Sequence, residues 1–185
     1  VVGGIGNTNF DLWAAGQRPQ NFYMLGSMGL AFPIALGIAL AQPKRHVFAL
    51  EGDGSLLMQL GCLSTIAAVA PRNLTLVLMD NGVYQITGGQ PTPAAGGTDF
   101  VATAQACGIA NSSWAADEED FERLIEASLT AGRPSLISEV RIVDASGHEV
   151  PRGTVGEVVV RGPHVMLGYW NKPDQTAAAV RDGCE

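Results

Sequence analysis

Cysteines, basic residues and long apolar runs are all scarce in this 185-residue chain. Cys62, Cys107 and Cys184 have no paired or metal-ligand spacing, so we expect reduced thiols and a cytoplasmic protein. Eleven Lys and Arg stand against eighteen Asp and Glu, and the net charge of −7 argues against binding to nucleic acid or to an anionic membrane. Apolar runs such as residues 30–41 are too short to span a bilayer.

Three familiar sequence signals are also missing. No signal peptide or transit sequence is recognised, and the chain begins at Val1 without a methionine, so we expect a trimmed fragment. No Gly-Lys-Ser/Thr occurs, which excludes a P-loop. A dinucleotide-binding loop would need a third spaced glycine at the position of Leu57, so a Rossmann site is not favoured.

Most of the chain alternates between predicted strands and predicted helices. The strands are continuous apolar runs, which are typical of a parallel sheet covered on both faces. We therefore predict an α/β fold with a doubly wound parallel sheet. The predicted strands cover residues 1–6, 46–51, 74–79 and 134–142, the predicted helices residues 29–41, 55–70, 100–107 and 118–130, and a glycine-rich loop residues 82–98.

The composition changes near residue 141, where β-branched residues and turn signals begin to dominate. A hairpin turn is predicted at residues 145–147, a strand at 156–161 and a short helix at 173–180. A hairpin alone is marginally stable in water. We therefore predict one domain over residues 1–141 and a short β-rich C-terminal appendage over residues 142–185 that is not an independent domain.

Two polar motifs follow neighbouring predicted strands. Gly52-Asp53-Gly54 ends the first strand, and Asp80-Asn81-Gly82 ends the next, with 26 residues between Gly54 and Asn81. That gap fits one βαβ crossover, which would bring Asp53 and Asn81 together at the ligand-binding edge of the sheet. A carboxylate and an amide oxygen suit Mg²⁺, and the glycines and the helix start near Ser55 suit a diphosphate. Gly-Asp-Gly alone would fit an ordinary β-to-α turn equally well.

With this spacing the two motifs resemble the thiamine diphosphate motif of a family of cofactor-dependent enzymes. Asp80 stands where that family usually has asparagine, and this substitution resembles the sulfopyruvate and phosphonopyruvate decarboxylase branch. The resemblance covers residues 1 to about 141 and implies the thiamine diphosphate-binding fold. Further matching segments are residues 21–29, 80–84, 87–90 and 98–100.

The resemblance implies a role for each matching residue. Asp53 and Asn81 would bind Mg²⁺ through their side chains, and Val83 through its backbone oxygen. Met28 would support the bent cofactor from below, and the Gly26 carbonyl would accept a hydrogen bond from the aminopyrimidine, so these two would set the catalytic conformation. The residues implied to contact the cofactor are Gly4, Gly6, Asn7, Thr8, Gly26, Ser27, Met28, Gly52, Gly54, Ser55 and Tyr84.

Some of these residues also fit simpler structural interpretations. Met28 would fit ordinary core packing. Asn7 and Thr8 would fit turn or helix-capping positions. Tyr84 would fit a packing role as well as a site role. These alternatives stay open at the level of sequence.

The function implied is the thiamine diphosphate- and Mg²⁺-binding part of a 2-oxo acid decarboxylase. In this family the activating glutamate comes from a pyrimidine-binding domain, for which 185 residues leave no space. We therefore expect a pyrimidine-binding partner subunit or domain, an oligomer, and a small 2-oxo acid as substrate. One alternative is a non-catalytic fragment or pseudoenzyme that only binds the cofactor, and another is an acyl-CoA ligase fragment.

The last alternative comes from residues 142–185, which resemble part of the acyl-CoA synthetase (adenylate-forming) superfamily. The phosphate-binding loop and catalytic lysine of that superfamily have no counterpart here, so we expect no adenylation. The matching segments are residues 144–151, 153–162, 166–170, 172–176 and 181–183.

Overall fold

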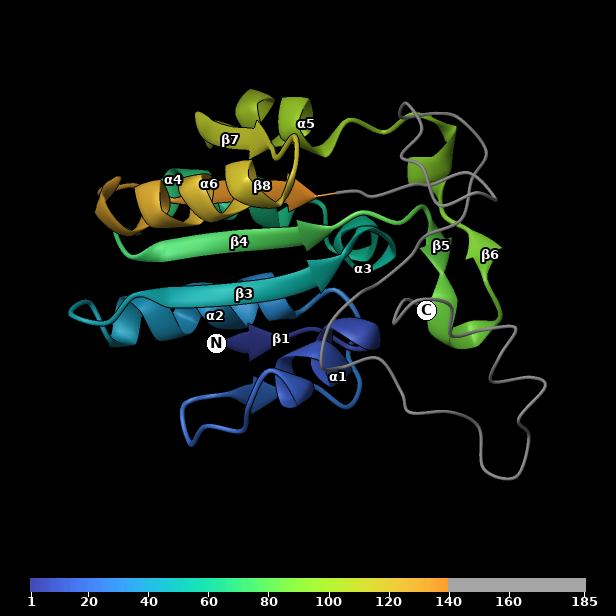
Figure 1. Ribbon diagram of the computed structural model, residues 1–185. Helices are drawn as coiled ribbons and strands as arrows, with labels where there is room; N and C mark the ends of the chain where they lie inside the picture. The colour runs from blue at the N-terminus through green and yellow to red at the C-terminus, as the bar shows by residue number, and fades with distance from the viewer. Residues whose placement is uncertain (140–185) are drawn as a thin grey trace. The chain divides into compact units, whose positions relative to one another are not determined.

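A six-stranded parallel sheet is the centre of residues 1–139, the part of the chain that the computed structural model describes (Figure 1). Its strand order is β2-β1-β3-β4-β8-β7, and every pairing is parallel. The predicted parallel sheet is therefore confirmed. The strands are β1 Val2–Gly3, β2 Phe22–Tyr23, β3 Val47–Gly52, β4 Leu74–Met79, β7 Asn111–Trp114 and β8 Ser135–Glu139.

Helices cover both faces of this sheet, as a doubly wound fold requires. In Figure 1, α6 lies on the near face and α2 and α4 lie behind the sheet. No helix within residues 1–139 is long and apolar enough to cross a bilayer. The helices are α1 Asn7–Ala14, α2 Ala31–Ala41, α3 Asp53–Met58, α4 Cys62–Val69, α5 Phe100–Ala106 and α6 Glu118–Thr130.

The sheet and the candidate site belong to one compact unit of the chain. That unit consists of Val1–Asn9 and Arg18–Val140. Phe10–Gln17, which includes most of α1, belongs to a second unit. The hairpin, strand and helix expected within residues 142–185 lie outside the described residues.

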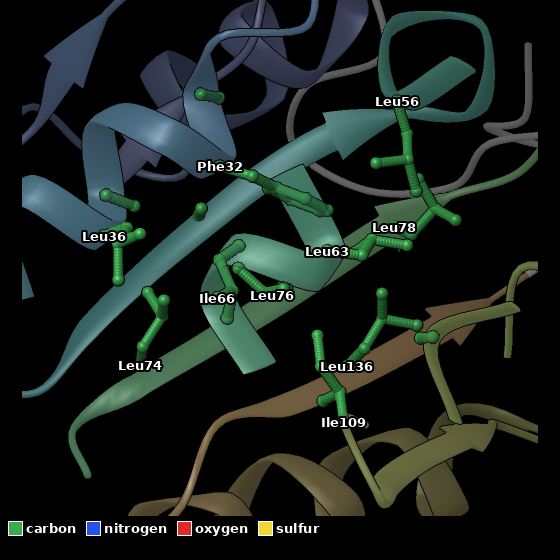
Figure 2. Close-up of a cluster of buried hydrophobic side chains, with 14 of the residues drawn as sticks. Phe32, Leu36, Leu56, Leu63, Ile66, Leu74, Leu76, Leu78, Ile109 and Leu136 are labelled. Carbon is green, nitrogen blue, oxygen red and sulfur yellow. The ribbon is translucent and has the colours of Figure 1, made fainter. Parts of the chain in front are cut away.

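The central strand β4 is buried on both faces. Leu74, Leu76 and Leu78 are fully buried and point into the main apolar cluster, which Figure 2 shows packed against α2 and α4. Thr75 points the other way, and its Oγ1 donates a hydrogen bond of 2.8 Å to Ser128 Oγ on α6. This two-sided burial explains why the strand is a continuous apolar run rather than an alternating one.

The structure differs from the sequence prediction in several elements. The helix expected over residues 55–70 is two helices, α3 and α4, because the backbone leaves the helical conformation at Gln59. Helix α1 and the short strands β2 and β7 were not predicted. The loop of residues 82–98 contains an antiparallel pair, β5 Val83–Tyr84 with β6 Gln90–Pro91, and two 3-10 turns, η1 Gln85–Thr87 and η2 Pro93–Gly96.

The two described cysteines carry no evident chemistry. Cys62 and Cys107 are free thiols and half-buried. Burial raises the pKa of Cys62 to about 11, so this thiol is protonated at neutral pH and is a poor nucleophile. The expectation of reduced thiols holds for these two residues.

Candidate functional site

The carboxyl ends of β3 and β4 bring the two predicted metal-binding residues together. Gly52 pairs with Met79 at the last position of the ladder. Asp53 begins α3 directly after β3 and is 2% exposed. The backbone N–H of Asn81 donates a hydrogen bond to the Asp53 carboxylate. The single crossover inferred from the 26-residue gap therefore exists.

The Asp53 carboxylate is oriented from a distant segment. Thr92 Oγ1 donates to Asp53 Oδ2 at 2.5 Å, and the backbone N–H of Ala94 donates to the same threonine oxygen at 3.2 Å. Burial raises the pKa of Asp53, and the hydrogen bonds from Thr92 and the backbone of Gly54 oppose that rise. A cation beside the carboxylate would offset the cost of burying its charge.

Asn81 lies in a network of side-chain amides. Its Oδ1 accepts from the backbone N–H of Val83 at 3.1 Å, and its Nδ2 donates to Gln85 Oε1 at 3.1 Å. Asn7 Nδ2 donates to the same Gln85 oxygen at 2.7 Å. Gln85 thus links the turn after β1 to the end of β4. Val83 pairs with Pro91 in the β5–β6 ladder, next to the hydrogen bond of 2.8 Å that the backbone N–H of Thr92 donates to the Gly82 carbonyl.

The predicted diphosphate-binding residues form the start of α3. Ser55 is 1% exposed, and its Oγ is buried without a hydrogen-bond partner of sound geometry. The Tyr84 ring lies over Gly54. A Cβ at that position would come within 2.3 Å of Tyr84 Cε1, so only a glycine fits beneath the ring. Gly52 has open space on its Cβ side. Since α3 has only six residues, its dipole adds little, and the unpartnered Ser55 hydroxyl is the stronger sign of an anion site.

The turn after β1 contains the other predicted cofactor residues. Thr8 is buried, and its Oγ1 donates to the Gly4 carbonyl at 3.0 Å. The hydroxyl donates to a carbonyl four residues earlier from within α1, so Thr8 is not a helix N-cap, whose side-chain oxygen would accept from a backbone N–H. Gly6 has φ +103 and open space around it, so its backbone remains accessible. The Asn7 side chain donates its hydrogen bond to Gln85 Oε1 and not to a backbone group of its own turn.

Gly26, Ser27 and Met28 lie on the segment between β2 and α2. Gly26 and Ser27 are exposed, and Met28 is half-buried and outside the main apolar cluster. Gly29 has φ +93, and a Cβ there would lie 2.6 Å from the Ser55 carbonyl oxygen. The segment therefore runs close against α3, which brings Met28 to the end of the sheet where Asp53 lies.

Three residues of this region were missed by the sequence analysis. Glu51 was recognisable, because Val47, Ala49 and Glu51 alternate on one buried face of β3. Thr92 and Gln85 carried no signal, since their partners lie 39 and 78 residues away in the chain. Contacts of that kind depend on the folded loop rather than on a local pattern.

Glu51 makes the stability of the protein depend on pH. It is fully buried, and burial raises its pKa from 4.5 to about 7, opposed by the hydrogen bond from the backbone N–H of Ala31 and by the nearby Ser55 hydroxyl and Phe32 N–H. Between these two pH values the folded chain holds more protons than the unfolded chain, so stability falls as pH rises through that window.

Glu51→Gln is expected to remove this pH dependence. Relative to the wild type, its free energy of unfolding should rise by up to about 3 kcal/mol between pH 4.5 and pH 8, because each pKa unit corresponds to about 1.4 kcal/mol. Urea unfolding of both proteins at the two pH values measures the change. A constant difference between them would show that Glu51 titrates normally.

The residues present fit a magnesium ion and a diphosphate. Within residues 1–139 no group of three or more His, Cys, Asp or Glu could hold a metal ion. A metal at this edge would therefore need one carboxylate, an amide oxygen, a backbone oxygen and oxygens of its ligand. That oxygen set is the one Mg²⁺ prefers when it is shared with phosphates. The buried Ser55 hydroxyl suits the anion.

Two groups of decarboxylases are similar to this chain. A phosphonopyruvate decarboxylase from Streptomyces hygroscopicus is 42% identical over 137 residues, which cover 74% of this chain and 34% of that enzyme. A sulfopyruvate decarboxylase subunit beta from Methanothermobacter thermautotrophicus is 45% identical over 162 residues, covering 85% of this chain and 86% of that subunit. The chain thus spans about a third of the first relative and most of the second.

A further relative has a different activity. A feruloyl-CoA synthase from an Amycolatopsis species is 37% identical over 102 residues, which are 53% of this chain and 21% of that enzyme. This partial likeness is consistent with the acyl-CoA synthetase resemblance of residues 142–185. Those residues lie outside the described structure, so no site is assigned to them.

Solved structures and a family model agree on the α/β part of the chain. A thiamin diphosphate-dependent enzyme from Mycobacterium smegmatis matches with a TM-score of 0.65 at 24% identity, over 75% of this chain and 28% of that one, which supports the fold. The family model described as the thiamine pyrophosphate enzyme, C-terminal TPP binding domain, matches residues 4–139. The chain therefore belongs to the thiamine pyrophosphate enzymes, as their C-terminal cofactor-binding domain.

Proposed function

We propose that this chain is the thiamine diphosphate- and Mg²⁺-binding part of a 2-oxo acid decarboxylase of the sulfopyruvate or phosphonopyruvate type. One observation carries the proposal: the buried Asp53 carboxylate stands beside Asn81 at the carboxyl edge of a parallel sheet. Ligands bind at that edge in open α/β sheets. The similarity to decarboxylases of both types supports the reaction.

The proposed metal and diphosphate sites share this edge. Asp53 and Asn81 would hold Mg²⁺ through side-chain oxygens, and Val83, two residues after Asn81 and hydrogen-bonded to it, through its carbonyl oxygen. Ser55 would donate its buried hydroxyl to the diphosphate, Gly52 leaves open space for its approach, and Gly54 would contribute its backbone. The bound cofactor supplies the electron sink that decarboxylation of a 2-oxo acid needs.

The remaining site residues would orient the cofactor. Met28 and the Gly26 carbonyl lie on the segment that runs against α3, and they would set the bent conformation and anchor the aminopyrimidine. Tyr84 covers Gly54 and would exclude water from the diphosphate end. Gly4, Gly6, Asn7, Thr8 and Ser27 would complete the lining of the site.

The proposed enzyme needs a second polypeptide or domain. The Methanothermobacter relative is named as a subunit beta, which supports a partner for this chain as well. The partner would bind the pyrimidine ring and supply the activating glutamate. None of the proposed site residues is basic, so the partner would also supply the cation for a sulfonate or phosphonate group on the substrate. We propose a cytoplasmic oligomer of the two.

Reconstitution tests the activity directly. The chain is mixed with the companion subunit of the Methanothermobacter enzyme, thiamine diphosphate and Mg²⁺, and CO₂ release from sulfopyruvate and from phosphonopyruvate is measured. We expect release from at least one substrate only when both polypeptides are present. Cofactor binding without CO₂ release would favour a non-catalytic fragment. ATP–pyrophosphate exchange, which tests an acyl-CoA ligase, is expected to be absent.

Thr92→Val is expected to weaken Mg²⁺ binding in the presence of thiamine diphosphate by about tenfold. The change keeps the side-chain shape but removes the hydroxyl that donates to Asp53, and losing such a supporting hydrogen bond commonly costs 10–100-fold in metal affinity. Thr92→Ser retains the hydroxyl and is the matched control. Calorimetric titration with Mg²⁺ measures both, and equal affinities for the two variants would rule out this role of Thr92.

A further inference from the structure

A carboxylate stands on the apolar face of β3. Val47 and Ala49 point into the main apolar cluster, and alternation along the strand places Glu51 on the same face. Glu51 is fully buried. A charged residue rarely occupies such a position unless polar groups compensate it, so its contacts show what it does there.

One carboxylate oxygen of Glu51 accepts a hydrogen bond from a backbone N–H group at the N-terminus of α2. Glu51 Oε2 accepts from the backbone N–H of Ala31 at 2.9 Å, and the backbone N–H of Phe32 also donates to the carboxylate. These are the first two residues of α2, whose N–H groups have no partner inside the helix. Leu30, which precedes them, makes no side-chain cap. Glu51 therefore caps α2 from a neighbouring strand.

The other oxygen faces the turn after β1. A Cβ on Gly4 would lie only 2.1 Å from Glu51 Oε1, so the residue at position 4 has to be glycine while this carboxylate is in place. The backbone N–H of Gly4 donates to the Leu50 carbonyl at 2.7 Å. Glu51 Oε1 and Ser55 Oγ both lack a partner of sound geometry. One side chain thus adjoins the turn after β1, the start of α2 and the residues of the metal turn.

The start of α2 fixes the segment of residues 26–28. The backbone N–H of Leu30 donates to the Ser27 carbonyl at 3.1 Å. Ser27 has φ 56 and Gly29 has φ +93, so two left-handed positions lie among the four residues that precede α2. Backbone in this conformation persists only where its surroundings hold it. The capped end of α2 is the nearest fixed point for it.

We propose that Glu51 is a positioning residue of the cofactor site, whose acceptor oxygens hold residues 26–28 in a fixed place relative to the turn of residues 52–54. The inference rests on the proposed function, because it is through Gly26 and Met28 that Glu51 acts on the cofactor. The essential property is the acceptor oxygen at the α2 terminus. The negative charge is not required.

Paired variants of the full 185-residue chain separate these properties. Glu51→Gln keeps an acceptor oxygen for Ala31 and removes the charge, whereas Glu51→Leu keeps similar bulk and removes the acceptor. Glu51→Asp keeps the carboxylate but shortens its reach, and it replaces Glu51→Leu if that variant does not fold. Thr75→Val is the control, because Thr75 is equally buried and hydrogen-bonded but lies at the opposite end of the sheet.

Two measurements are made on each variant. Amide hydrogen exchange reports how firmly residues 26–32 are held, and calorimetric titration reports the affinity for thiamine diphosphate with Mg²⁺. For Glu51→Leu we expect exchange in residues 26–32 to accelerate by at least about tenfold while β4 stays protected, and cofactor affinity to fall by at least about tenfold. Glu51→Gln should stay within about threefold of the wild type in both. Thr75→Val should lower stability without either effect.

Three results would show that Glu51 does not position residues 26–28 for the cofactor. Equal acceleration of exchange in residues 26–32 and in β4 would make Glu51 a general stability residue and would overturn the proposal. Unchanged cofactor affinity in Glu51→Leu, or an equal loss in Glu51→Gln, would also overturn it. If the wild type itself bound no thiamine diphosphate, the proposed function would fail, and the exchange data would still show whether Glu51 holds residues 26–28.

Discussion

Asp53→Ala is expected to lower the Mg²⁺-dependent affinity for thiamine diphosphate by at least about 100-fold. Asp53 is the only carboxylate among the proposed metal ligands, and losing even a supporting residue of a metal site costs 10–100-fold. Equilibrium dialysis with labelled cofactor, with and without Mg²⁺, measures the loss. The far-UV circular dichroism should be unchanged, because the side chain contacts the edge of the sheet and not its core.

Asp53→Asn is the matched control for this change. It keeps the side-chain volume and the oxygen that accepts from Thr92, but it removes the charge that a cation needs. The amide nitrogen of Asp53→Asn cannot accept from the backbone N–H groups of Gly54 and Asn81 that donate to the carboxylate, so the stability of this variant is measured beside its cofactor binding. Mg²⁺-dependent cofactor binding at wild-type strength in Asp53→Ala would remove the metal assignment.

Gly29→Ala is expected to destabilise the fold by about 3 kcal/mol. Its φ of +93 disfavours any side chain, and the new Cβ would lie 2.6 Å from the Ser55 carbonyl oxygen and 2.8 Å from Gln59 Cγ. The left-handed backbone costs about 1–2 kcal/mol, and the backbone contact adds a cost of similar size, as overpacking does. Urea unfolding at a fixed pH measures the difference from wild type.

Gly97→Ala separates the two causes. Gly97 has a similar φ of +110 but no atom within 4 Å of its Cβ direction, so only the backbone term of about 1–2 kcal/mol applies. If Gly29→Ala lowers the free energy of unfolding by more than Gly97→Ala does, the difference measures how closely residues 26–29 pack on α3. Equal losses in the two variants would mean that this segment is not held closely against α3.

The centre of the fold and the main polar pair were predictable from sequence. Strands β3 and β4 are apolar runs bounded by turn residues, and the helices between strands indicate right-handed crossovers in a parallel sheet. The end of each such strand lies at the same edge. The adjacency of Asp53 and Asn81 followed from that geometry and the spacing alone, and the structure places the two together.

The missed elements lack the signals on which sequence prediction depends. Strand β7 carries Ser112 and Ser113, so it has no apolar run, and it forms because β8 offers it an edge. Strand β2 has two residues, too few for any periodicity. The break between α3 and α4 lies at Gln59, where composition alone favours a continuous helix.

The missed site residues show the same limit. Thr92 reaches Asp53 only because the antiparallel pair β5–β6 folds its loop back over α3. No local sequence pattern predicts that this loop folds back and brings Thr92 to Asp53. Glu51 was visible in the alternation of β3, but its partner Ala31 becomes evident only when α2 is placed against the sheet. Local chemistry was thus predictable, and contacts between distant segments were not.

Titration of the 185-residue chain with thiamine diphosphate, in Mg²⁺ and in EDTA, shows whether the metal and the diphosphate share one site at the ends of β3 and β4. The site described above predicts saturable binding near one cofactor per chain that weakens by at least about tenfold without the metal, because carboxylate, amide and diphosphate oxygens share the ion. Thiamine, which lacks the diphosphate, should not bind. Equal affinity with and without Mg²⁺, or binding of thiamine as tight as that of its diphosphate, would contradict the account.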